Sequence, residues 1–308
     1  MNNNSSRSTR KFVIFKKVII FLFILFTLYA VLSVLGASAA INLPRLPVKD
    51  SPYSVGLSYE NVSFQARDDN ITLKGWFIPG EKHLVVIIIH GGFQNRVDKT
   101  VDTLPLSRDL VKRGYSILLF DLRGRGESEG KGKTLSYINE DIEGAVDFLK
   151  NRGYSSSEIA LLGFCSGAAS ACIFASFEDI GGLVLDGCFA SVKRMFINQA
   201  SSRHIPMFLS SFFYGGLKFS AELLYDFKVV DPQDVIHLIK CPIFLIHEEH
   251  DKFVSEEETL TLYHKSASRL KLLWEIPDAN HSEGYVMYPE EYINRIDGFL
   301  KNALLVKR

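Results

Sequence analysis

The sequence predicts an α/β protein: a doubly wound, mostly parallel sheet with a helical cap insertion, preceded by one N-terminal transmembrane segment. Strand-like and helix-like runs alternate from residue 55 to the C-terminus, the pattern of a parallel sheet covered by helices on both faces. The run Leu84–Ile89 is apolar and rich in β-branched residues, as expected for a strand buried on both faces. Near the N-terminus, Val18–Leu35 is an uncharged, almost wholly apolar run of about 18 residues, the lower limit for a membrane span.

The N-terminal segment is expected to be an uncleaved signal anchor. Basic side chains in residues 1–17 predict a cytoplasmic tail, residues 18–40 a membrane span, and residues 41–54 a linker. Because positive charge favours the cytoplasmic side, residues 55–308 would lie on the extracytoplasmic side of the cell membrane, held by a single pass. Ala37-Ser38-Ala39 resembles a signal-peptide cleavage site, so a cleaved signal peptide is the alternative. A buried core helix fits less well, because no polar face interrupts the apolar run.

Composition narrows the function classes. The 35 basic and 35 acidic residues cancel, and no basic face interleaved with aromatic residues is evident, so no nucleic-acid partner is expected. About 250 residues follow the linker, enough for one large α/β domain. Four cysteines do not make a disulfide scaffold in a chain this long. No metal-ligand spacing is found, and no cofactor is predicted.

The expected elements follow in order after the linker. The predicted strands are 62–66, 71–77, 84–89, 116–120, 159–164, 182–185, 243–246 and 271–276. The predicted helices are 103–113, 139–152, 168–175, 255–266 and 289–304. The first two strands flank Asp68-Asp69-Asn70, a turn signal that predicts a hairpin. In the second helix, Ile142, Val146 and Leu149 recur at helical spacing.

One insertion, at about residues 192–235, breaks the alternation of strands and helices. It is rich in Phe, Met, Leu and Tyr, and it separates two predicted strands by a long stretch. The insertion therefore predicts a helical cap over a site at the sheet edge. The alternative is that it adds to the hydrophobic core.

The most informative short stretch joins the strand 159–164 to the helix after it. Gly163 and Gly167 flank a tight turn, as in the G-x-S-x-G nucleophile elbow, in which the central residue sits at the tip of a strained turn. Here the central residue is Cys165, and Ser166 comes one position late. Three interpretations are open: Cys165 is a thiol nucleophile, the site is inactive, or Ser166 has taken over. The last is disfavoured, because the residue after the nucleophile starts the helix and offers its backbone N–H instead.

Polar residues follow several predicted strands, and the carboxyl ends of parallel strands meet at one edge of the sheet, where ligands bind. Asp251 lies in the loop after one strand, and His281 lies about 30 residues later in the loop after the last strand. The chain order is therefore nucleophile, acid and histidine. Asp186, also directly after a strand, is the rival acid.

The remaining polar residues near these loops are given structural roles. His90 is expected to be a structural hydrogen-bonding group, and Arg123 and Arg125 are expected to brace loops through carboxylates. The loop after the strand 243–246 is predicted to contain four polar residues without a catalytic role: His247, Glu248, Glu249 and His250.

Taken together, the motifs HGGF, DLRGRGES, GFCSGAAS, CPIFLIHEEHDKFVS and DANHSEGY resemble the α/β-hydrolase superfamily. The resemblance spans about residues 84–285 and is nearest to membrane-anchored hydrolases of the esterase-like and peptidase-like type. It implies the α/β-hydrolase fold with Cys165 as nucleophile, Asp251 as acid and His281 as base. It also implies that the backbone N–H groups of Gly92 and Ser166 form the oxyanion hole. This subgroup normally carries serine at the elbow, whereas dienelactone hydrolases and polyester synthases resemble the sequence in carrying cysteine there.

The function implied is hydrolysis of carboxylic esters or thioesters by a Cys-His-Asp triad. The thiol pKa, about 8.5 in isolation, falls at a helix N-terminus or beside an imidazolium, and Cys165 is predicted to have both neighbours. The expected partners are a small-molecule or lipid-like acyl substrate and, through the N-terminal helix, the membrane. Two alternatives remain: a catalytically silent binding protein with this fold, and an acyltransferase.

Overall fold

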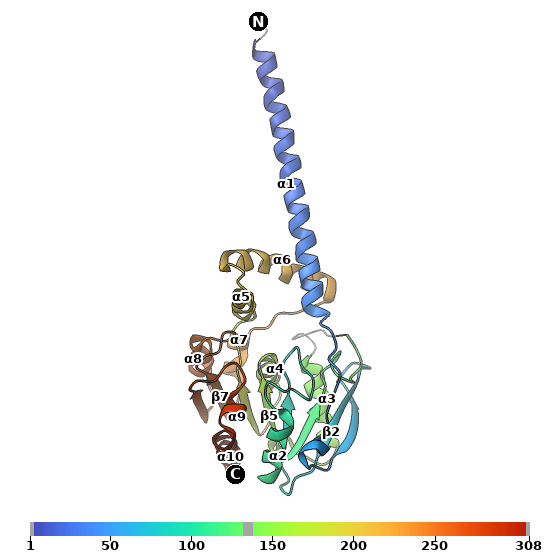
Figure 1. Ribbon diagram of the computed structural model, residues 1–308, viewed down its shortest axis with the longest axis vertical. Coiled ribbons are helices and arrows are strands. Elements are labelled where there is room, and N and C mark those ends of the chain that lie inside the picture. Colours follow the sequence, from blue (N-terminus) through green and yellow to red (C-terminus); the bar gives the residue numbers. More distant parts are fainter. Residues whose placement is uncertain (1–2, 132–137, 306–308) are drawn as a thin grey trace.

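The computed structural model describes residues 3–131 and 138–305, built around one eight-stranded sheet (Figure 1). The strand order is β1-β2-β4-β3-β5-β6-β7-β8. The strands are β1 Glu60–Gln65, β2 Thr72–Ile78, β3 Val85–Ile89, β4 Ser116–Phe120, β5 Ile159–Phe164, β6 Gly182–Asp186, β7 Ile243–Glu248 and β8 Lys271–Ile276. The predicted hairpin forms between β1 and β2; β2 is antiparallel to β4, and all later pairings are parallel. The predicted mostly parallel, doubly wound sheet is confirmed.

Helices cover both faces of the sheet. The longer ones are α2 Thr103–Lys112, α3 Ile138–Asn151, α4 Ser166–Ala175, α8 Glu256–Lys265 and α10 Pro289–Leu305. Apolar side chains of α3, α4 and α8 pack on one face, and those of α2 and α10 pack on the other. The short elements are the helices α7 Pro232–Val235 and α9 Gly284–Met287 and the 3₁₀ turns Pro52–Val55, Ser156–Glu158 and Ile236–Leu238.

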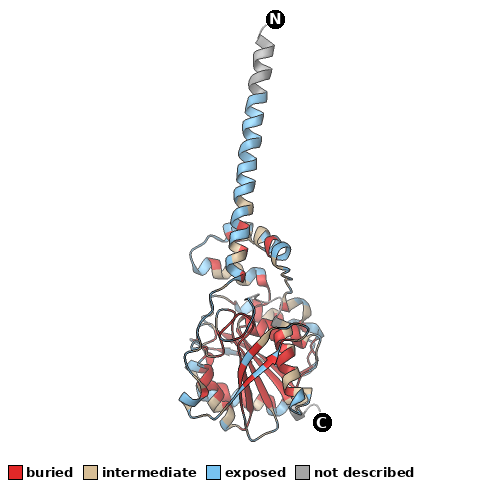
Figure 2. Cartoon of the chain, turned by 90° about the vertical axis from the view of Figure 1, so that its right-hand side faces the viewer, coloured by how far each residue is buried: buried red, intermediate tan, exposed pale blue. Residues whose placement is uncertain are grey.

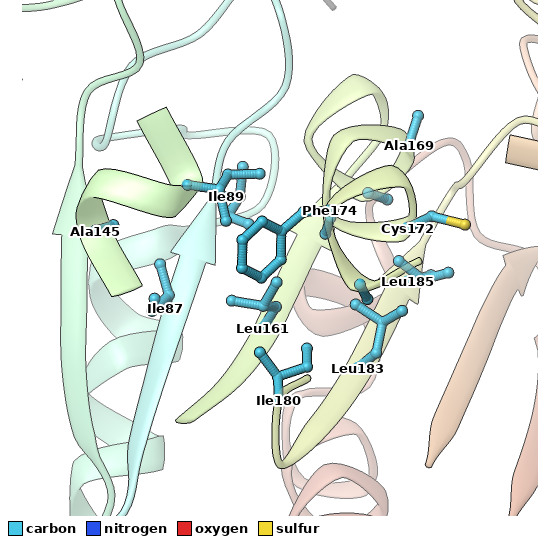
Figure 3. Packing of buried hydrophobic residues seen from close by; sticks show 14 of the residues in the cluster. Ile87, Ile89, Ala145, Leu161, Ala169, Cys172, Phe174, Ile180, Leu183 and Leu185 are labelled. Atoms are coloured by element: carbon cyan, nitrogen blue, oxygen red, sulfur yellow. The ribbon is translucent and has the colours of Figure 1, made fainter. Parts of the chain in front are cut away.

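The core lies between the central strands and the helices that cover them. Leu161 of β5 and Leu183 and Leu185 of β6 point to the same face as α4, where Phe174 packs over the sheet near Ile89 (Figure 3). All of these side chains are fully buried. Burial of one such side chain contributes about 1.5–3 kcal/mol, so the carboxyl ends of these strands rest on a rigid base.

The N-terminal helix α1, Asn3–Ile41, extends far beyond the sheet and is exposed along most of its length (Figures 1 and 2). Its stretch Phe12–Ile41 is long and apolar enough to cross a membrane. The predicted cap region is helical and contains α5 Val192–Ser202 and α6 Met207–Tyr225. In Figure 1, α6 runs crosswise to α1 and lies on the far side of α5 from the sheet. Residues 1–2 of the predicted tail and 306–308 of the predicted domain lie outside the described residues.

Two sequence-based expectations are corrected. His247 and Glu248, predicted to lie in a loop, are buried residues of β7, because this strand continues to pair with β8 through Glu275 and Ile276. Arg125, predicted to brace a loop through a carboxylate, instead donates to the backbone oxygen of Leu43 at 3.3 Å.

Arg123 has the predicted role. It bonds Asp141 at 2.7 Å, Glu140 at 2.9 Å and Asp69 at 3.1 Å. These carboxylates come from α3 and from the turn of the first hairpin. Arg123 therefore fixes the loop after β4 to the elements on either side of it.

Candidate active site

Cys165 is the single residue between β5 and α4, and it has a backbone conformation that few residues adopt. Its φ is +52° and its ψ is −119°, and its N–H donates to the backbone oxygen of Asp186 at 3.0 Å. The two flanking glycines allow this turn. A Cβ on Gly163 would lie 2.6 Å from Cα of Ala168, and one on Gly167 would lie 2.5 Å from the oxygen of His90. A conformation of this kind costs on the order of 1–3 kcal/mol and persists where the surroundings enforce it.

The turn exposes Cys165 and hides the neighbouring hydroxyl. Cys165 is partly exposed, whereas Cys172, Cys188 and Cys241 are buried. Ser166 is buried in the first turn of α4, and its Oγ has no hydrogen-bond partner among the described residues. With no base in contact with this hydroxyl, the geometry favours Cys165 over Ser166 as a nucleophile.

Asp251 and His281 meet at the carboxyl edge of the sheet. Their Oδ2 and Nδ1 atoms lie 2.6 Å apart, and the Asp251 side chain is fully buried. Its other oxygen accepts hydrogen bonds from the backbone N–H groups of Phe253 at 2.7 Å and Val254 at 2.9 Å. Because a carboxylate only accepts, Nδ1 of His281 carries a proton, and Nε2 faces the other side of the ring.

Cys165 also acts on the His281 ring electrostatically. Nε2 is buried and has no hydrogen bond of standard geometry from the described residues. Burial disfavours the charged ring, but the Cys165 sulfur and the Asp251 carboxylate outweigh it and raise the pKa of His281 well above its ordinary value. The Phe253 ring meets the imidazole edge-on, with centroids 5.1 Å apart. These neighbours favour the charged form of the His281 ring.

The loop after β3 passes beside Cys165. A Cβ on Gly91 would lie 3.5 Å from Cβ of Cys165. His90 fixes this loop: its Nδ1 lies 2.7 Å from the oxygen of Gly91, and its Nε2 accepts from the N–H of Leu122 at 3.1 Å. Burial lowers the pKa of His90 to about 4, so the ring is neutral and can donate at one nitrogen while it accepts at the other.

His90 thus has the structural role predicted for it, and the oxyanion donors remain a prediction. Ser166 begins α4, so its N–H belongs to the helix N-terminus beside Cys165. Gly92 follows Gly91 in the buried part of the loop. Both predicted donors therefore belong to segments that adjoin Cys165.

The rival acid Asp186 has other partners. It is fully buried at the end of β6, and its Oδ2 accepts a hydrogen bond from the Tyr292 hydroxyl at 2.6 Å. Glu248, at the end of the neighbouring strand β7, interacts with the same carboxyl. This buried carboxyl pair was not predicted, because Tyr292 and Glu248 are distant in sequence and carry no local signal for it. The geometry selects Asp251 as the partner of the His281 imidazole.

Stability should depend on pH through Glu248. Burial and the negative Asp186 raise the pKa of Glu248 well above its ordinary value. The folded chain therefore holds a proton that the unfolded chain loses above about pH 4.3, so stability falls as pH rises. We expect Glu248→Gln to remove this pH-dependent loss of the free energy of unfolding, which is at most about 1.4 kcal/mol per pH unit. The measurement is the midpoint of thermal unfolding in detergent between pH 5 and 8.

Glu249→Gln is the matched control, because Glu249 is exposed and lies one position further along the chain. Its unfolding midpoint should follow the unsubstituted protein at every pH. A Glu248→Gln midpoint that stays at a constant offset from the unsubstituted protein would contradict the prediction.

Gly187, directly after Asp186, leaves room for the imidazole. Its φ is +60°, and a Cβ there would lie 2.8 Å from Cε1 of His281. We expect Gly187→Ala to displace the ring, and a shift of about 1 Å can lower kcat about 10²-fold. Gly153→Ala is the control, because its φ is +94° and its Cβ would meet no described atom within 4 Å. Both variants should lose stability through backbone strain, and equal activities in the two would contradict this role for Gly187.

One group of side chains could hold a cation. Ligand atoms of Glu249, His250 and Asp278 all lie within 4.8 Å of one another, and all three residues are exposed. Exposed acidic groups of this kind are common without an ion. It is given no part in the chemistry below.

Comparisons with known proteins agree with this fold. Residues 85–203 match the family described as "alpha/beta hydrolase fold". The chain has the α/β-hydrolase fold. The esterase Pf2001 of Pyrococcus furiosus has a similar structure, with a TM-score of 0.71 and 28% sequence identity, covering 85% of this chain and 99% of that one. The family match and this neighbour support a hydrolase.

Two proteins from other organisms are similar to this chain in sequence. An uncharacterised protein of Salmonella typhi, YfhR, is 24% identical over 95% of this α/β hydrolase and 98% of its own length. A thiohydrolase of Aspergillus aculeatus, aneE, is 32% identical over 42% of each chain.

Proposed function

We propose that this α/β hydrolase cleaves carboxylic esters or thioesters with Cys165 as nucleophile, His281 as acid and base, and Asp251 as the orienting acid. One observation carries the proposal. His281 is hydrogen-bonded to Asp251 through Nδ1, and the Cys165 sulfur, at the exposed tip of the elbow, helps to raise the pKa of its imidazole. A catalytically silent binding protein would have no need of this arrangement.

In the first half of the reaction, the Cys165 thiolate attacks the substrate carbonyl carbon and a C–S bond forms. The negative oxygen would be held by the backbone N–H groups of Gly92 and Ser166. One such donor is worth about 2.7–4 kcal/mol in well-studied enzymes. As the tetrahedral intermediate collapses, the bond to the leaving alcohol or thiol breaks, and Nε2 of His281 gives it a proton.

In the second half, the acyl group leaves the enzyme. Neutral His281 takes a proton from water, and the resulting hydroxide attacks the thioester carbonyl. The C–S bond breaks, the carboxylic acid is released, and the thiolate–imidazolium pair is restored. Asp251 keeps the proton on Nδ1 throughout, so Nε2 stays available for both transfers.

The location proposed for this reaction is the membrane surface. α1 supplies an apolar helix of sufficient length, and basic residues precede the apolar run. We infer a single-pass anchor with the hydrolase domain on the extracytoplasmic side. A small-molecule or lipid-like acyl compound suits a site held at that surface. The esterase and thiohydrolase relatives support both leaving groups.

Intact-mass measurement of the full chain tests the chemistry. Brief reaction with p-nitrophenyl butyrate should add one butyryl group and release p-nitrophenolate in equal amount. The adduct should map to Cys165 and be absent in Cys165→Ala. A butyryl group found on Ser166 would overturn the assignment. No adduct, with no p-nitrophenolate released, would favour a silent binding protein.

A further inference from the structure

The outer face of α6 is an apolar stripe that the described chain leaves largely exposed. Phe208, Phe212, Phe219 and Leu223 are 76%, 61%, 64% and 68% exposed. With Gly215 they occur at positions i, i+4, i+7, i+11 and i+15, which fall on one side of a helix. An exposed aromatic stripe of this length is unusual on a protein surface in water, where large apolar patches mark contact sites.

The stripe points away from the hydrolase domain. On the other side of α6, Tyr214 packs against Phe196 of α5, with ring centroids 5.7 Å apart. Ser210 and Ala221, on the same side as Tyr214, are buried. Since α5 lies between α6 and the sheet (Figure 1), the stripe faces the direction in which α1 extends.

α6 is closely packed on the domain-side end of α1. The Tyr29 hydroxyl donates to the backbone oxygen of Phe212 at 3.1 Å, and the Tyr29 and Phe212 rings lie 4.8 Å apart. A Cβ on Gly216 would lie 2.7 Å from the Tyr29 hydroxyl, and one on Gly36 would lie 2.5 Å from Cδ2 of Leu217. Glycines on both helices thus allow the backbones to approach, as in tightly packed membrane helices.

The contact runs from inside the span to its domain-side edge. A span of about 20 residues that starts at Val18 ends at Ala37. Gly36 therefore lies at the edge of the span, and Tyr29 lies about 12 Å along the helix axis inside it. Phe23 and Phe26, earlier in α1, are both 68% exposed. Through Tyr29, the apolar surface of α1 continues without interruption onto Phe212 of the stripe.

We propose that α6 lies in the plane of the membrane, with its Phe208–Leu223 stripe inserted into the leaflet on the domain side. The occupant of the stripe is the phospholipid bilayer itself, because the stripe continues the surface of a helix that crosses it. Interfacial helices bury such a face about 5–10 Å into the boundary between headgroups and acyl chains. Lys218 and Glu222, an ion pair at 3.7 Å, flank the stripe and can reach the headgroups.

This insertion would hold the cap and the active site at the membrane surface. The Asn198 amide of α5 donates to the backbone oxygen of Phe253 at 3.0 Å, in the loop that carries Asp251. An acyl compound in the leaflet would then be adjacent to the cap. The inference rests on the membrane anchor in the proposed function, and it does not depend on the chemistry at Cys165.

Tryptophan quenching by brominated lipid tests the insertion in the full chain. Phe219→Trp and Leu223→Trp are reconstituted in phosphatidylcholine vesicles, with or without bromine on the acyl chains. The native Trp76 and Trp274 are buried, so the unsubstituted chain supplies the background. We expect brominated lipid to reduce the emission of both new tryptophans.

Two further substitutions control the result. Phe177→Trp replaces a 57% exposed aromatic residue just beyond α4, at the opposite end of that helix from Cys165, and its emission should not change. Phe23→Trp reports on α1 and should be quenched. Emission from Phe219→Trp that is unchanged by bromine would overturn the proposal, and so would an unquenched Phe23→Trp.

Blue-shifted but unquenched emission would mean that a second protein copy covers the stripe, which also overturns the proposal. The series is repeated in the Cys165→Ala background and should give the same quenching. Hydrolysis that persists in Cys165→Ala with intact quenching would contradict the proposed chemistry alone, so the two failures are distinguishable.

Discussion

Cys165→Ala should abolish hydrolysis of p-nitrophenyl butyrate. Removal of a triad nucleophile lowers kcat by up to about 10⁶-fold, because no covalent intermediate can form and only binding and oxyanion contacts remain. The measurement is initial-rate kinetics of the full chain in detergent. The variant should fold as the unsubstituted protein does, because alanine is smaller than cysteine and fits the same turn.

Cys172→Ala is the matched control, since Cys172 is fully buried in α4 and away from the exposed face of the turn. It should keep its activity and remain sensitive to a thiol alkylator. The unsubstituted enzyme should lose activity on alkylation, because Cys165 is the cysteine that the described structure leaves partly exposed. Turnover that survives both alkylation and Cys165→Ala would remove this thiol from the mechanism.

Cys165→Ser separates a thiol enzyme from a lost serine hydrolase. The Cys165 sulfur is among the groups that raise the pKa of His281, and a neutral serine hydroxyl cannot replace it in that role. A serine hydroxyl is also far less acidic than a thiol, so it depends more on the imidazole to remove its proton during the attack. Activity should therefore fall in Cys165→Ser. A gain of esterase activity from an inert parent would show that the site is a serine site that has lost its nucleophile.

Local sequence patterns were sufficient to predict the scaffold and the meeting of Asp251 with His281. The β-branched run before His90 predicts a buried strand, and the glycines around Cys165 predict a tight turn. Each of these patterns lies within a few residues of the chain. Strand ends followed by Asp251 and His281 then place both side chains at the same edge of a parallel sheet, whatever the sheet order. For this reason the meeting of Asp251 and His281 could be expected before any contact was known.

Features that depend on distant segments could not be predicted in this way. β7 extends as far as Glu248 only because β8 continues beside it, and no residue in the loop signals that extension. The pairing of Tyr292 with Asp186 joins segments 106 positions apart. Gly187 did offer a signal, since a glycine directly after a strand end often has a positive φ. Its contact with His281 was nevertheless visible only in three dimensions.

The packing of α6 on α1 is a further case. The insertion is apolar enough to predict helices, but its sequence does not say which of its faces is buried. Phe208, Phe219 and Leu223 are exposed, whereas Tyr214 packs against Phe196 of α5 and Phe212 contacts Tyr29 of α1. These contacts between distant segments decide which side of α6 is covered.

Asp251→Asn should lower kcat/KM on the order of 10⁴-fold at neutral pH. The carboxylate now accepts the proton of Nδ1, whereas an amide can turn its NH₂ group to the ring and donate to Nδ1. The proton would then sit on Nε2, the nitrogen that must exchange protons with Cys165, the leaving group and water. Substrate binding should change little, so the loss should appear in kcat more than in KM.

Asp186→Asn is the matched comparison, because the two carboxylates follow adjacent strands and both are fully buried. Asp186 accepts from Tyr292 and not from the imidazole, so its variant should keep most of the activity while losing stability through the disturbed pair with Glu248. Thermal unfolding and initial rates on both variants separate the two roles. If Asp186→Asn lost more activity than Asp251→Asn, the acid would have to be reassigned, and the 2.6 Å contact between Asp251 and His281 would describe a resting geometry that the reaction does not use.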